Sequence, residues 1–161
     1  MLACGSSPSA GTPPGGSSPA ASQSASGSGK AAEFHIVVSG GPAPGTFDVT
    51  TATPCQYSVS QKIWNTGYAG DITAATGLAV ISFSIDASKN PALITVGVMS
   101  NGTNGYQYTV STIVPEGAPG SSGTVTIQGD ANSGATFTFQ SKTGDGHEVD
   151  GTVKCNQTTK L

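Results

Sequence analysis

Apolar and polar residues alternate with a period of two through most of the chain after residue 31. Such alternation places the apolar side chains of each run on one face of a β-strand. The alternating runs are residues 34–38, 47–49, 55–59, 81–85, 94–98, 106–110, 125–127, 137–139 and 149–155. The pattern therefore predicts an all-β domain of about eight short strands.

Turn-forming residues separate these runs. Pro, Asn, Asp and Gly cluster at residues 89–91, 101–105, 130–134 and 143–146, and they favour tight connections between antiparallel strands. We therefore expect an antiparallel β-sandwich, because two separate sheets bury the alternating runs without closing into a barrel. Residues 61–76 are the least strand-like segment, and we expect a short helix or a surface excursion there, around Trp64.

The first part of the chain has a different composition. Residues 5–29 contain only Ser, Gly, Pro, Ala, Thr and one Gln. Alanine is the only apolar residue among them, so this segment cannot bury enough surface to offset the entropy lost on ordering. We expect residues 1–31 to form a disordered tether and residues 32–161 to form the sandwich domain.

Charge excludes several classes of function. Only 9% of the 161 residues are charged, and the formal net charge is −3. A protein that tracks nucleic-acid phosphates needs clustered Lys and Arg, and the six basic residues here do not cluster. No apolar run approaches the roughly 20 residues that span a bilayer. We therefore expect no nucleic-acid partner and a nearly uncharged surface.

The cysteines indicate a compartment. Cys55 and Cys155 both lie in strand-like runs, and we predict that they form a disulfide. The bond would close a loop of about 100 residues, which contributes about 4.7 kcal/mol in the chain-entropy model. The alternative is a pair of buried reduced thiols. Low charge and a flexible segment favour the disulfide, and with it an oxidising, extracytoplasmic location.

The third cysteine, Cys4, suggests a membrane anchor. The segment Met1-Leu2-Ala3-Cys4-Gly5-Ser6-Ser7 resembles the lipobox that ends a bacterial lipoprotein signal. In that family the cysteine is diacylated and becomes the mature N-terminus. The resemblance implies that Cys4 is the lipidated residue, that residues 5–29 are its spacer, and that the chain's partner is a membrane. An unmodified cysteine near a disordered end is the alternative.

Three further segments carry a wider resemblance. They are Gly45-Thr46-Phe47 ahead of Cys55, then Gly123-Thr124-Val125-Thr126-Ile127, and finally Gly151-Thr152-Val153-Lys154-Cys155. With these the domain resembles small surface lipoproteins of actinobacteria and similar bacteria, a class that includes mycobacterial surface antigens. The resemblance implies a disulfide-closed sandwich displayed outside the cell membrane, and it supplies no catalytic residue.

The chain offers little for catalysis. Nucleophilic catalysis needs a Ser or Cys beside a base, and the only histidines are His35 and His147. His35 alternates with apolar neighbours and should face outward. His147 stands near Asp145, Glu148 and Asp150, which suits either a metal site or a solvated polar hairpin. We expect the hairpin, and we predict no enzyme activity, no metal and no cofactor.

Two aromatic residues are candidates for ligand binding. Trp64 and Tyr68 lie in an irregular segment among Asn and Gly residues, where aromatic rings can stack on a sugar or line an apolar cleft. The alternative for Trp64 is a packing residue that covers the end of a sheet.

Taken together, these features predict a non-catalytic, lipid-anchored cell-surface domain that serves display, adhesion or recognition. The first alternative is a carrier that binds a lipid or a glycan; it requires a contiguous apolar pocket between the sheets, whereas display requires a filled core. A second alternative is a subunit of a surface filament, paired through an exposed edge strand. The candidate ligands are lipids, glycans and proteins.

Overall fold

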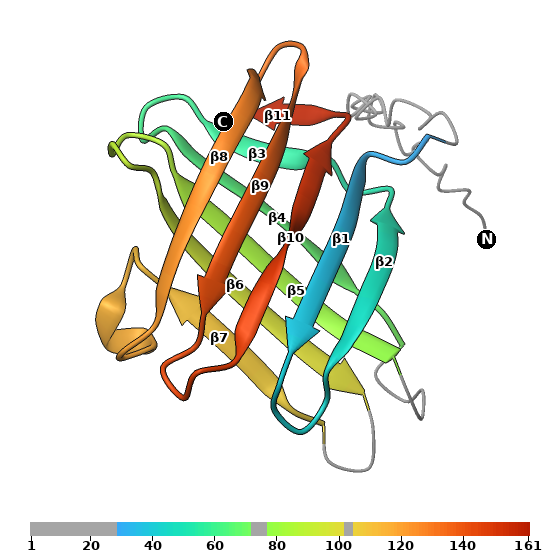
Figure 1. Ribbon diagram of the computed structural model, residues 1–161. Coiled ribbons are helices and arrows are strands. Elements are labelled where there is room, and N and C mark those ends of the chain that lie inside the picture. The colour runs from blue at the N-terminus through green and yellow to red at the C-terminus, as the bar shows by residue number, and fades with distance from the viewer. Residues whose placement is uncertain (1–28, 72–76, 102–104) are drawn as a thin grey trace, which may run out of the picture.

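The computed structural model describes residues 29–71, 77–101 and 105–161 and shows two facing β-sheets (Figure 1). Sheet A contains, in spatial order, β2 (Gly45–Thr51), β1 (Ala32–Ser39), β10 (Glu148–Cys155), β9 (Gly134–Lys142) and β8 (Ser122–Asp130). Sheet B contains β11 (Thr158–Lys160), β3 (Cys55–Ser58), β4 (Ile63–Ala69), β5 (Gly77–Asp86), β6 (Leu93–Asn101) and β7 (Gln107–Ser111). The predicted all-β sandwich is confirmed, with eleven strands in the described segments rather than about eight. Cys4 and the expected tether lie outside the described residues, apart from its last three positions.

The prediction of a helix or excursion at residues 61–76 is wrong where the structure describes it. Strand β4 occupies Ile63–Ala69 and pairs antiparallel with β3 on one side and β5 on the other. Its alternation is weak because Thr66 stands between Trp64 and Tyr68 on the inward-facing side. Hydrogen bonding from two neighbouring strands fixes this segment, and a local pattern does not reveal those partners.

The last strand was also missed, and it makes the sheet mixed. β11 runs parallel to β3, with Thr158 opposite Cys55 and Lys160 opposite Tyr57. The backbone N–H of Leu161 donates to the Tyr57 carbonyl at 2.9 Å, which extends the pairing to the end of the chain. Three polar residues are too few to show a period, so this strand cannot be recognised from local alternation.

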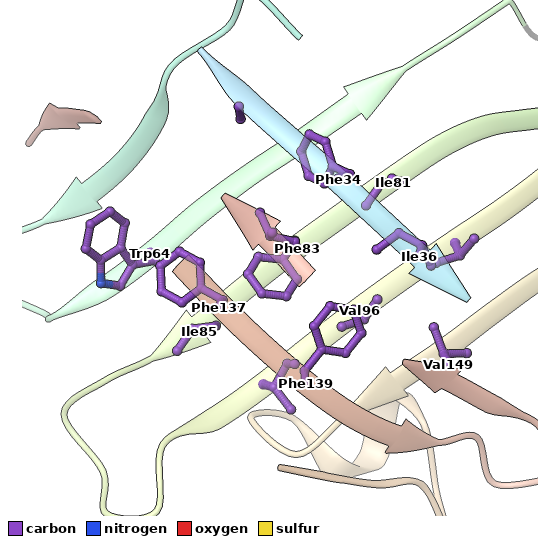
Figure 2. Packing of buried hydrophobic residues seen from close by; sticks show 14 of the residues in the cluster. Phe34, Ile36, Trp64, Ile81, Phe83, Ile85, Val96, Phe137, Phe139 and Val149 are labelled. Atoms are coloured by element: carbon purple, nitrogen blue, oxygen red, sulfur yellow. The ribbon is translucent and has the colours of Figure 1, made fainter. Parts of the chain in front are cut away.

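The space between the sheets is filled by apolar side chains. Phe83 of β5 lies 5.6 Å from Phe137 and 5.4 Å from Phe139 of β9, measured between ring centroids, so these rings join the two sheets (Figure 2). Ile36 of β1 and Val96 of β6 are completely buried in the same cluster. The alternation read from the sequence therefore points each run into one common core.

A single covalent bond also joins the sheets. Cys55 begins β3 in sheet B and Cys155 ends β10 in sheet A, and their Cα atoms are 5.8 Å apart. Both residues are fully buried, at 0% and 1% exposure. The predicted disulfide is thus confirmed and lies at the end of the sandwich where the described chain enters. No helix in the described segments is long and apolar enough to cross a membrane.

Replacing both bridged cysteines, as Cys55→Ala with Cys155→Ala, should lower the free energy of unfolding by about 2–5 kcal/mol. The reason is that the unfolded chain regains the freedom of a loop closed across 100 residues. Urea unfolding followed by tryptophan fluorescence measures the change, with Cys4→Ala as the control that leaves the midpoint in place. An unchanged midpoint in the double variant would contradict the stabilising role.

Candidate functional site

Trp64 and Tyr68 do not form one site. Trp64 is only 4% exposed, and its ring packs edge-on against Phe137 at 5.1 Å. Tyr68 lies four residues further along β4, about 13 Å away at the rise of a strand, where it packs at the border of the core. The structure therefore gives Trp64 a packing position, and direct ligand binding by either residue stays a prediction.

The accessible ring near Trp64 belongs to Tyr57. Tyr57 of β3 stands directly opposite Trp64 of β4, and the two ring centroids are 4.7 Å apart. Tyr57 is half-buried, and it lines an open hollow of about 370 Å³ together with Val59 and Ile127. We call this the Tyr57 hollow; its lining residues are Tyr57, Val59, Trp64, Ala87, Ile127, Gly129, Asp130, Ala131, Asn132 and Lys160.

The polar rim of the Tyr57 hollow comes from the turn between β8 and β9. Asp130 Oδ1 accepts hydrogen bonds from the backbone N–H of Asn132 at 2.7 Å and of Ser133 at 2.9 Å. These bonds, first that of Ser133 and then that of Asn132, lower the pKa of Asp130, and the nearby Lys160 ammonium lowers it further. The Asp130 carboxylate is therefore ionised at neutral pH and fixed in position.

Lys160 completes the rim from β11. Its Nζ donates a hydrogen bond to Asn132 Oδ1, which links the end of the chain to the β8–β9 turn. Asp130, Asn132 and Gly134 belong to the turn predicted at residues 130–134, in which Gly134 adopts φ +95°. The hollow combines an apolar floor with one carboxylate, one ammonium and one amide, and its lining residues include no histidine or cysteine. These three polar groups can donate and accept hydrogen bonds at the edge of an apolar surface.

A second polar cluster lies at the other end of the sandwich. The Tyr106 hydroxyl donates to Asp145 Oδ2 at 2.9 Å, and His147 Nε2 lies 3.2 Å from the same oxygen. The Tyr108 ring stacks edge-on with His147 at 5.9 Å, and its hydroxyl accepts the Ala43 N–H at 2.9 Å. The hairpin that carries His147 is therefore packed against two tyrosine rings.

The metal ligands considered from the sequence do not converge. Glu148 is exposed, and Asp150 Oδ1 accepts the backbone N–H of Ser141 at 2.9 Å. Within residues 29–71, 77–101 and 105–161 no group of three His, Cys, Asp or Glu side chains is arranged to hold a metal ion.

His35 faces solvent, as its alternation predicts. Its Nδ1 lies 2.6 Å from Asp48 Oδ1 across the β1–β2 pair, and the two side chains are 53% and 73% exposed.

Comparison with protein-family models, with curated proteins and with solved structures finds no match for this chain. A functional assignment therefore has to come from the geometry of its own residues.

Truncating the buried ring, as Trp64→Ala, should lower the free energy of unfolding by about 3–5 kcal/mol, because it leaves a cavity beside Phe137. Urea unfolding followed by circular dichroism measures the loss. Trp64→Phe keeps most of the contact and should lose less. An Ala variant that kept its unfolding midpoint would contradict the packing role of Trp64.

The pKa of Asp145 is lowered first by the Thr143 hydroxyl and then by the Tyr106 hydroxyl, since both donate to the carboxylate. Tyr106→Phe removes one donor and should raise this pKa toward its ordinary value, as measured by NMR titration of the carboxyl carbon. A carboxyl whose folded pKa is lowered adds stability above its ordinary pKa and loses it as the pH falls through the folded value. Asp130 serves as the control, because its donors are untouched; a change at Asp130 but not at Asp145 would contradict the assignment.

Proposed function

We propose that this chain is a non-catalytic recognition domain displayed outside the cytoplasm, anchored to a membrane through an acylated Cys4. The observation that carries the proposal is the Tyr57 hollow, where an ordered aromatic floor meets a fixed polar rim. Recognition surfaces gain affinity when their groups are already positioned, because less side-chain entropy is lost on binding.

The filled interior supports surface recognition over internal transport. Phe83, Phe137 and Phe139 occupy the centre of the sandwich at 1% exposure or less (Figure 2). A carrier that encloses a lipid needs an apolar cavity there, since most of the ligand surface must be buried. The Tyr57 hollow opens at the surface, so a ligand would reach it without separation of the sheets.

The disulfide supports the location. Structural disulfides persist in oxidising compartments and are rare in a reducing cytosol. Two acyl chains on Cys4 would hold the domain firmly, because each buried CH₂ group contributes about 0.8 kcal/mol. Residues 5–29 would then separate the sandwich from the membrane.

In the organism that makes the protein, an alkyne-labelled fatty acid should be incorporated into the full chain, and Cys4→Ala should abolish the label. The expected partition is into the membrane fraction, with Cys55 and Cys155 still protected from thiol reagents. The matched control is Cys55→Ala with Cys155→Ala, which keeps Cys4 and should keep the label. Labelling that survives Cys4→Ala, or reduced Cys55 and Cys155 inside the cell, would overturn the proposal.

A further inference from the structure

We infer that the Tyr57 hollow binds an uncharged sugar ring of a glycan. The inference rests on the proposed recognition function and names the ligand class for the same surface. Three properties of the hollow lead to it: a fixed aromatic face, unused hydrogen-bonding capacity on the rim, and a balance of one positive against one negative charge.

The aromatic face is held in place from below. Tyr57 contacts Trp64, and Trp64 in turn contacts Phe137 in the core, with centroid separations of 4.7 Å and 5.1 Å. The ring of Tyr57 is therefore supported by side chains that do not move freely. A fixed, half-buried aromatic ring presents an apolar surface of the kind that the C–H face of a pyranose can cover.

The rim has hydrogen-bonding capacity that the turn does not use. Asp130 uses Oδ1 to bind its own turn, and Oδ2 accepts no hydrogen bond from the described part of the chain. Lys160 has three donors and gives one to Asn132 Oδ1, while the Asn132 amide nitrogen has two further donors. Sugar hydroxyls both donate and accept, so neighbouring hydroxyls of one ring can pair with this mixed set.

Charge favours a neutral ligand over an ionised one. A phosphate or carboxylate that approached Lys160 would be repelled by the ionised Asp130. A cationic group that approached Asp130 would be repelled by the Lys160 ammonium. A fatty acyl chain fits poorly as well, because it would strip water from Asp130, Asn132 and Lys160 without replacing their hydrogen bonds. Sugar hydroxyls can hydrogen-bond to Asp130, Asn132 and Lys160 without bringing a like charge close to either ionised group.

The volume of the Tyr57 hollow limits how much of a glycan can contact it. A hollow of about 370 Å³ lies at the lower end of the range for small-molecule sites, about 300–1,000 Å³. It accommodates one sugar ring and part of a neighbour rather than a long oligosaccharide. We therefore expect weak binding of a single site, near millimolar, strengthened when many copies of the domain are displayed together.

Saturation-transfer NMR on the full chain tests the inference with three uncharged probes: maltotriose, mannotriose and cellotriose. At least one should bind saturably. Tyr57→Ala should weaken that binding by tenfold or more, whereas Tyr57→Phe should stay within twofold because the ring remains. Tyr106→Ala, which removes a tyrosine at the other end of the sandwich, is the matched control and should also stay within twofold.

Asn132→Ala and Lys160→Met keep the test independent of folding, since both side chains are exposed and lie outside the core. Each should weaken sugar binding at least threefold while the variant stays fully folded at the assay temperature, as circular dichroism shows, because loss of an exposed pair costs little stability. Binding of no probe, unchanged binding in Tyr57→Ala, or preference for glucose 1-phosphate or a dodecanoate probe would each overturn the inference. If Cys4 is still acylated and the disulfide still formed, any of these results leaves the displayed recognition domain standing with a different ligand.

Discussion

The Cys55–Cys155 bond is the constraint on which the arrangement of the site depends. It joins the start of β3 in one sheet to the end of β10 in the other, and the chain continues from Cys155 into β11 only three residues later. Because Cys155 is fixed beside β3, the last residues can pair parallel to that strand. Lys160 therefore lies opposite Tyr57, at the rim of the Tyr57 hollow, although 103 positions separate the two residues in the sequence numbering.

The hollow also depends on packing inside the sandwich. A series of ring contacts runs from Phe83 through Phe137 to Trp64 (Figure 2). Trp64 in turn contacts Tyr57, so the floor of the hollow is continuous with the core. Close-packed interiors resist local displacement. Because Tyr57 packs against Trp64, its ring is held in one position. Trp64 thus holds Tyr57 in place from the core side, and Tyr57 is the half-buried ring of the pair.

The sequence predicted those features that local alternation encodes. Runs such as residues 34–38 and 94–98 alternate cleanly because one face is buried and the other is solvated, and both form strands. Strand β4 was not predicted because its inward-facing positions include the polar Thr66. Strand β11 was not predicted because three residues are too few to show a period. Alternation places Tyr57 on the inward-facing side of its run, and no local pattern shows that its ring borders a hollow. That position depends on pairing with β4 and β11 and on the distant β8–β9 turn.

The β8–β9 turn lies at one end of the sandwich and the β9–β10 turn at the other (Figure 1). The polar side chains at these two ends differ in how many of their hydrogen-bonding atoms already have partners within the protein. At the Tyr106 end, Asp145 uses Oδ1 for the Thr143 hydroxyl and Oδ2 for Tyr106 and His147, so both of its oxygens have partners within the protein. These contacts hold loops together and leave little for a ligand. At the Tyr57 end, Asp130 orders its turn through one oxygen and keeps the other. Polar groups that are fixed but not fully satisfied are the ones able to pair with an incoming molecule, which is why we place recognition at the Tyr57 hollow.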